Sequence, residues 1–309
     1  MTSIPDPRPA HTPYDGSSKP FTIGLKPLSL DDWIEPGPDL EDQLDEKARL
    51  YAEIPEKVFV EEPDSRGVQA EVLDLLVEHL PRRFPDIYRK DGDAMLIGQG
   101  GRRVLLGADP ASLRTASLLV AEDLIVMRKG EGGWRLAAGS LCFPSSWSLV
   151  EKFGKPLQDI HAPVPGFGPG TRSADLINRM FDGLQGQAVE RYNWSIQAGS
   201  ALYHPLSGQQ RIDRATGRPT KFPDGDIDGR AFIRVERQTL RKLPVSKDIL
   251  FTIRIHIDPL KVLDRHPDRV ALAESFAAQL DAMEEAQLDY KGLTSDRDRL
   301  AARLRAMAR

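Results

Sequence analysis

The chain has 309 residues, enough for one large or two ordinary domains, and its 40% hydrophobic and 28% charged residues are typical of a soluble globular protein. A net charge of −4 and a sequence pI near 5.9 give no electrostatic footprint for nucleic acid. The single cysteine, Cys142, excludes an internal disulfide and any four-cysteine metal or iron–sulfur site in this chain. The N-terminus lacks the basic and apolar regions of a signal peptide, and no run of about 18 apolar residues could span a membrane. We therefore expect a cytoplasmic protein.

The N-terminal quarter predicts an irregular arm followed by helices. Residues 1–20 contain five prolines among mostly polar residues, so we expect an arm that is either disordered or draped over a neighbouring surface. Leu40–Ala52 is rich in Glu, Asp, Lys and Leu and is typical of a helix. Ser65 can cap a second helix, whose apolar residues recur at three- and four-residue spacing. His79 is expected to be a surface or end-of-helix residue.

The hydrophobic period changes at about residue 94, where two hairpins are expected. Ala94–Gly98 and Arg103–Gly107 are short apolar runs across a Gly-containing turn, and Leu124–Arg128 and Trp134–Leu141 form a second pair. The Gly-rich turn at 129–133 lacks the Lys-Ser/Thr of a phosphate-binding loop and is not followed by a helix. Nucleotide binding there is therefore rejected.

The stretch Leu141–Phe167 presents one histidine in a conformationally restricted setting. After a short amphipathic helix at about Ser146–Phe153, His161 lies in Ile-His-Ala-Pro-Val-Pro-Gly. Pro163 and Pro165 fix φ at their own positions and push the preceding residues toward extended geometry. A stiff loop that presents a single imidazole suits a metal or haem-iron ligand. The alternative is a loop histidine whose neighbours terminate a helix.

The remaining connections predict helices and one flexible segment. Thr171 or Ser173 starts a helix with an apolar stripe. Ser207–Gly229, rich in Asp, Gly, Arg and Pro, is expected to be a mobile loop, and its Asp-Gly repeats lack the spacing and final Glu of a calcium loop. A long helix over Pro267–Leu288 and a charged helix from about Ser295 are expected to pack or to bind partners.

Three strands carry most of the remaining information, at Val189–Ile196, Phe232–Leu240 and Ile249–Ile257. In the first strand, alternation places Glu190 on one face with two aromatic residues and an isoleucine. A carboxylate in such a place must be paired, hydrogen-bonded or functional. The other two strands form a hairpin across Leu243–Asp248.

This hairpin is expected to have one apolar side and one polar side. The polar strip would contain Arg234, Glu236, Arg254 and His256. Such a strip is either a solvent face or a lining that neutralises an acidic ligand, because guanidinium groups match carboxylates.

Four sequence blocks together point to a known family. CFPSSW, IHAPVPGF, ERYNWSI and RVERQTLRKLP…ILFTIRIHIDPL, in this order, resemble the haem-dependent oxidative N-demethylase family, the haem-containing subunit of dimethylamine monooxygenase. The resemblance spans roughly Phe21 to Leu288. It implies an α+β fold in which a PAS-like antiparallel sheet has flanking helices. We accordingly divide the chain into an irregular arm (1–20), a haem-binding PAS-like domain with an N-terminal helical extension (21–264) and C-terminal helices (265–309).

The resemblance also implies a chemistry. Family members hold haem b, activate O2 and oxidise a small secondary amine such as dimethylamine to a primary amine and formaldehyde. Their electrons come from NADPH through partner reductase subunits that carry flavin and an iron–sulfur centre, and this chain has neither a dinucleotide fingerprint nor the cysteines for its own reductase. No membrane or nucleic-acid partner is implied, and the chain can work as a homo- or hetero-oligomer. The alternatives are a haem-binding PAS-like sensor and a non-catalytic subunit.

Carried over residue by residue, the resemblance makes His161 the axial iron ligand. Cys142 is the alternative, as a thiolate of the P450 type, although a buried inert thiol is the commoner case. Glu190 and Glu236 are the two candidates for a carboxylate that holds the protonated amine and relays protons. The expected contacts to the haem propionates are Arg191, Arg234, Arg237 and Arg254, and those to the macrocycle are Trp147, Tyr192 and Trp194.

Overall fold

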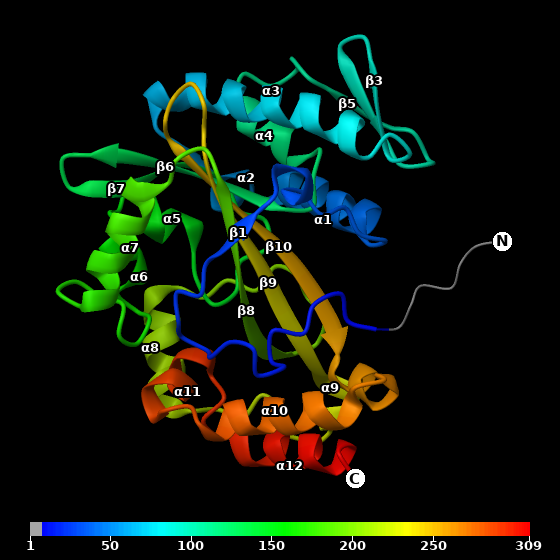
Figure 1. Ribbon diagram of the computed structural model, residues 1–309, viewed down its shortest axis with the longest axis vertical. Helices are drawn as coiled ribbons and strands as arrows, with labels where there is room; N and C mark the ends of the chain where they lie inside the picture. The colour runs from blue at the N-terminus through cyan, green and yellow to red at the C-terminus, as the bar shows by residue number, and fades with distance from the viewer. Residues whose placement is uncertain (1–7) are drawn as a thin grey trace.

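The structure, a computed structural model, describes residues 8–309, so the part of the predicted arm at residues 1–7 lies outside the described residues. Its centre is a seven-stranded sheet with the order β1-β8-β9-β10-β6-β7-β2, in which every neighbouring pair is antiparallel (Figure 1). The strands are β1 (Lys26–Leu28), β2 (Phe59–Glu61), β6 (Asp123–Gly130), β7 (Gly133–Ser140), β8 (Ala188–Ala198), β9 (Ala231–Lys242) and β10 (Ile249–Pro259). The predicted α+β class is confirmed at this level.

A second, three-stranded sheet lies at one end of the molecule (Figure 1). It consists of β3 (Tyr88–Asp91), β4 (Ala94–Ile97) and β5 (Arg102–Leu105), so the predicted hairpin is confirmed and β3 is an additional strand. The predicted pairing of β6 with β7 and of β9 with β10 is also confirmed.

The register of β9 against β10 contradicts the predicted polar strip. Arg254 pairs with Arg237, whereas Glu236 pairs with Ile255 and Arg234 pairs with Ile257. Residues directly opposite in an antiparallel pair share a face. Glu236 and Arg234 therefore lie on the isoleucine side, and Arg254 and His256 lie on the other. The alternation of residues within each strand was predicted correctly. The predicted register between β9 and β10 was wrong by one residue, and such a shift places the residues of one strand on the opposite face of the sheet.

Helices from the N-terminal part cover one end of the sheet. These are α1 (Leu40–Glu53), α2 (Pro55–Val58), α3 (Arg66–Arg83) and α4 (Ser112–Ser117), with short 3₁₀ turns at Leu30–Asp32 and Pro63–Ser65. Their apolar side chains form a core with Leu124, Val126 and Leu250 of the sheet. His79 lies near the end of α3, as one of the two predictions has it, but the surface position is wrong, because its ring is buried and lies 5.4 Å from the ring of Trp33. This burial lowers the pKa of His79 to about 4.

The C-terminal helices and the arm lie at the other end of the sheet (Figure 1), where α10 (Arg269–Asp281) and α12 (Arg297–Met307) pack against β8 and β9. The single helix predicted over Pro267–Leu288 is instead two, α10 and α11 (Glu285–Lys291), because Glu284 begins α11 with a capping box to Gln287. They are preceded by a 3₁₀ turn at Leu260–Arg265 and followed by α12. In the arm, Tyr14 is fully buried and stacks on Phe276, with ring centroids 4.4 Å apart.

The remaining helices come from the two long connections on either side of β8. They are α5 (Leu149–Lys152), α6 (Leu157–His161), α7 (Arg172–Gly183), α8 (Gly208–Gly217) and α9 (Ile227–Arg230). The loop predicted over Ser207–Gly229 is therefore wrong in part, since Ser207 and Gln210 form a capping box that starts α8. Within residues 8–309, the helices are too short or too polar to cross a lipid bilayer.

Candidate functional site

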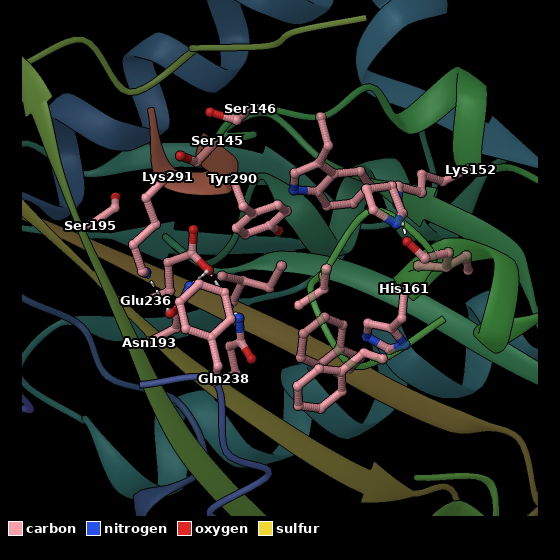
Figure 2. Close-up of a pocket in the computed structure, with 18 of the residues that line it drawn as sticks. Ser145, Ser146, Lys152, His161, Asn193, Ser195, Glu236, Gln238, Tyr290 and Lys291 are labelled. Carbon is pink, nitrogen blue, oxygen red and sulfur yellow. Dashed lines mark hydrogen bonds between the residues drawn. The ribbon is translucent and has the colours of Figure 1, made fainter. Parts of the chain in front are cut away.

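A cavity of about 430 Å³ lies between one face of the sheet and the surrounding helices. Its walls come from strands β6 to β10, from the α5–α7 region and from α8 and α11. One part is apolar, with Met127, Leu157, Phe167, Met180, Phe181 and Ile253. The opposite part is polar and contains Asn193, Ser195, Glu236, Gln238, Tyr290 and Lys291 (Figure 2). A volume of this size is typical of sites for small molecules and cofactors.

His161 enters the cavity from the apolar side (Figure 2). The prediction of a loop position is wrong, because His161 is the last residue of α6, which begins after Pro156. Its Nδ1 atom is buried and has no hydrogen-bond partner among residues 8–309. Burial, with the Lys152 ammonium group adding to it, lowers the pKa of His161 to about 4, and the Leu157 backbone offsets this only in part. The imidazole is therefore neutral at pH 7, as an iron or zinc ligand must be.

Lys152 and Trp147 form the wall next to His161. The Lys152 ammonium group donates a hydrogen bond to the Ile160 carbonyl and lies 5.9 Å from the centroid of the Trp147 ring. Burial lowers the pKa of Lys152 to about 8. Trp147, expected to contact a macrocycle, does line the cavity.

Glu236 lies across the cavity from His161 and is held in place by two amides (Figure 2). Its Oε2 accepts hydrogen bonds from Gln238 Nε2 at 2.9 Å and from Asn193 Nδ2 at 3.3 Å, and its Oε1 lies 3.7 Å from the buried Arg234 Nε. The amides reach the carboxylate because Asn193 is the β8 partner of Glu236 and Gln238 is two residues further along β9. The Glu236 side chain is 14% exposed, so its carboxylate is largely shielded but still faces the cavity.

The cavity carries an excess of positive charge. Its lining includes the cations Lys152, Arg191, Arg211, Arg214, Lys221 and Lys291, while Glu236 is the one carboxylate among the described residues that line it. The Nε atoms of Arg191 and Arg214 are buried without a hydrogen-bond partner in the described chain. Burial lowers the pKa of Lys221 to about 7 and that of Lys291 to about 8. Guanidinium groups with free donors in such a setting favour an anionic ligand group, since they match carboxylates.

Glu190 does not reach this cavity. It lies on the other face of β8, where its Oε2 accepts hydrogen bonds from Arg237 Nε at 2.9 Å and from the Tyr192 hydroxyl at 3.4 Å. Glu190 was correctly predicted to lie on the same face of β8 as the aromatic residues. This face is covered by helix α10, and Trp194 on the same face packs against Phe276 of that helix. The role of Glu190 is therefore that of an ion-pair partner on the far side of the sheet.

Five further residues expected at the cofactor make other contacts. The buried Arg234 donates to the carbonyls of Phe143 and Leu202, and Arg237 donates to those of Asp32 and Trp33. Arg254 is paired with Asp39 and Gln43, and Trp194 donates from Nε1 to Gln279. Arg234, Arg237, Arg254, Trp194 and Tyr192 are absent from the lining of the cavity as the described residues form it. Among the expected residues, the structure brings together His161, Trp147, Arg191 and Glu236.

Cys142, the alternative ligand, is buried away from the cavity, and burial raises its thiol pKa to about 12, which disfavours a thiolate. A second histidine, His204, lines the cavity together with His161. Its main chain bridges to the segment 144–146, since its amide donates to the Pro144 carbonyl at 3.1 Å.

Several lining residues were missed by the sequence reasoning. Arg211 and Arg214 lie on α8, and the Ser207–Gln210 capping box that starts this helix was a usable signal. Tyr290 and Lys291 come from the end of α11, just beyond the helix that was predicted over Pro267–Leu288. No local pattern indicates that these two residues face a cavity formed by strands distant in sequence.

The family comparison agrees with the blocks identified in the sequence. A family model described as "haem-dependent oxidative N-demethylase, alpha subunit-like" matches residues 24–301. This match includes the cavity residues Trp147, His161, Arg191, Glu236 and Lys291, which come from five separate parts of the fold. With nearly the whole chain matched, the protein belongs to the haem-dependent oxidative N-demethylase alpha subunit-like family.

Proposed function

We propose that this chain is the haem-binding subunit of a monooxygenase that N-demethylates a small secondary amine, such as dimethylamine, to a primary amine and formaldehyde. The observation that carries the proposal is the buried, neutral imidazole of His161, which lines the same cavity as the carboxylate of Glu236. The antiparallel sheet with helices on both faces is compatible with the PAS-like arrangement implied by the family resemblance.

The residues present fit haem b. The His161 imidazole would ligate the iron, because it is neutral and faces the cavity. The apolar side chains of the cavity suit the faces of a porphyrin, and Trp147 would pack beside it. Arg191, Arg211 and Arg214 would neutralise the propionates. When bound, haem b supplies the iron at which O2 is activated.

Glu236 would hold the protonated amine. A carboxylate accepts a charge-assisted hydrogen bond from an ammonium group, and the amides of Asn193 and Gln238 hold the Glu236 carboxylate in a fixed orientation. The same carboxylate can accept the ammonium proton at Oε1 or Oε2 and pass it on, which is the role of a general base. The apolar walls exclude water and would contact the methyl groups of the amine.

Electrons would come from partner subunits. We propose that these subunits carry flavin and an iron–sulfur centre and draw electrons from NADPH. The support is that the matched family model describes an alpha subunit and that this chain has one cysteine and no dinucleotide-binding fingerprint.

The test has two stages. Protein purified with haem supplied should show a Soret band that His161→Ala abolishes and His204→Ala retains, which is a matched control because both histidines line the cavity. The loaded protein is then given dimethylamine, a reductant and O2, and formaldehyde is measured. A colourless parent protein would remove haem binding altogether. A coloured protein that binds O2 reversibly without forming formaldehyde would instead support a sensor or a non-catalytic subunit.

A further inference from the structure

A second group of potential ligands lies on the opposite face of the sheet from the cavity, where the N-terminal arm crosses β10. His11 comes from the arm, Glu35 from the segment before α1, and His256 from β10. Glu35 Oε1 lies 2.8 Å from His11 Nε2 and 3.8 Å from His256 Nε2. One donor atom from each of the three residues falls within 4.8 Å of the other two.

The hydrogen bonds within the described chain do not account for this arrangement. His11 and Glu35 are hydrogen-bonded, but His256 Nε2 is buried and has no hydrogen-bond partner among residues 8–309. A buried polar atom without such a partner costs free energy, so these atoms are rare in native proteins unless they serve another group. The unpaired nitrogen belongs to the residue that lies deepest of the three, with 12% of its side chain exposed.

The spacing is close to that of a transition-metal site. Zn²⁺ binds histidine nitrogen and carboxylate oxygen at about 2.0–2.2 Å, and tetrahedral geometry then separates neighbouring donor atoms by about 3.3 Å. The separations of 2.8 and 3.8 Å lie on either side of this value. The donor atoms of His11 and His256 lie within 4.8 Å of each other, and the part of the arm that carries His11 contains neither helix nor strand, so His11 can move toward a bound ion.

The protonation states also suit a cation. Burial lowers the pKa of His256 to about 4, so its lone pair is free at pH 7. Burial acts to raise the pKa of Glu35, but the hydrogen bond with His11 and the positive charge of Arg237 act against it, and the net pKa is lowered. Glu35 is therefore ionised.

The neighbouring arginines orient the carboxylate, and each of them is itself paired with another carboxylate. Arg237 Nε lies 3.5 Å from Glu35 Oε2, the second oxygen of the carboxylate, and is itself paired with Glu190 at 2.9 Å. Arg254 of β10 is paired with Asp39, and Asp258 is the next acidic group along the strand. Such outer contacts fix ligating carboxylates in known metal sites.

We propose that His11, Glu35 and His256 form a binding site for one divalent transition-metal ion, with Zn²⁺ as the best match to two imidazoles and one carboxylate. Side-chain exposures of 24% for His11 and 30% for Glu35 leave room for water in the fourth position. The ion would fasten the arm to β10, and His11 also lies against the Tyr192 ring of β8 at 4.8 Å. The site is separate from the cavity and does not depend on the proposed function.

The experiment uses the full chain loaded with haem, so that His161 is not available to the added metal. After treatment with a chelator and dialysis, the protein is titrated with ZnCl₂ by calorimetry, and bound zinc is measured after gel filtration. The variants are His11→Ala, Glu35→Gln and His256→Ala, and the control is His266→Ala, which removes a histidine whose Nδ1 accepts a hydrogen bond from the nearby Asp268 amide. If the parent chain does not retain haem, the titration is performed in the His161→Ala background.

We expect one equivalent of Zn²⁺ in the parent and in His266→Ala, with affinity weakened by about tenfold or more in each of the three ligand variants. Added Zn²⁺ should also raise the Tm of the parent and of His266→Ala but not that of His11→Ala. His11→Ala is the decisive variant because it changes a partly exposed residue of the arm and leaves the core intact. The proposal is overturned if the parent binds less than one equivalent, or if His11→Ala and Glu35→Gln bind zinc as the parent does. Absence of haem or of formaldehyde production would leave this result unaffected.

Discussion

Replacing Glu236 by Gln tests the proposed amine site most directly. The change keeps the size of the side chain and its position between Asn193 and Gln238, and it removes the one negative charge that the described residues contribute to the cavity lining. A protonated amine would then lose its charged partner and meet an uncompensated excess of positive charge. We expect weaker amine binding with little change in haem content.

The structure allows the size of the effect to be worked out. A hydrogen bond to a charged group contributes about 1.5–3 kcal/mol, and each 1.36 kcal/mol corresponds to about a tenfold change in an equilibrium constant. The Glu236 side chain is only 14% exposed, so solvent screening is weak and a value within this range is appropriate. We therefore expect the Kd for dimethylamine to rise by about 10- to 150-fold.

The assay titrates dimethylamine into the haem-loaded protein and follows the visible spectrum, and kcat/KM is measured separately from formaldehyde release. Glu190→Gln is the matched control, because Glu190 lies on the opposite face and is paired with Arg237. An unchanged Kd in Glu236→Gln, or an equal loss in Glu190→Gln, would show that Glu236 does not hold the amine.

Three further predictions concern the ligand, the core and the capping of α8. Since burial lowers the pKa of His161 to about 4, protonation of the imidazole competes with iron binding only as the pH falls toward that value. The Soret band should therefore persist at pH 5.5. Loss of half of the Soret absorbance near pH 6.5 would contradict this prediction. Arg234→Met should leave the buried carbonyl of Phe143 unpaired and reduce the free energy of unfolding, measured by urea denaturation, by about 3 kcal/mol. A reduction of less than about 0.5 kcal/mol would mean that water replaces the guanidinium group as the partner of this carbonyl. Ser207→Ala should remove the capping box with Gln210 and cost about 1 kcal/mol of local stability, seen as hydrogen exchange about fivefold faster in α8 and unchanged in α10.

The sequence was sufficient for most elements, because hydrophobic period and turn residues are local properties. The hairpins β6–β7 and β9–β10 were predicted from alternation and intervening turns, and α7 was predicted from Thr171, which does cap it. The break between α10 and α11 and the helix α8 were missed, although both begin with a capping box in which Gln is the third helical residue.

The site was predicted less completely, for a physical reason. Alternation sorts residues within one strand, but the register between strands and the layer that covers each face depend on long-range packing. This is why Glu236 was placed with Arg254 rather than with Ile255, and why Glu190 was kept as a candidate beside Glu236. His161 was identified by its block, whereas Lys291 carries no local sign that it faces the cavity.

Strand β8 has a consequence for how such proteins can diversify. Of its successive residues, Arg191 lines the cavity on one face and Tyr192 contacts His11 of the arm on the other, so both faces of this strand make specific contacts. A single inserted or deleted residue in the middle of β8 would exchange these two surfaces for every position beyond it. Relatives with different substrate preferences should therefore differ here by substitution at constant length, while variation in length is confined to the connections at the two ends of the strand.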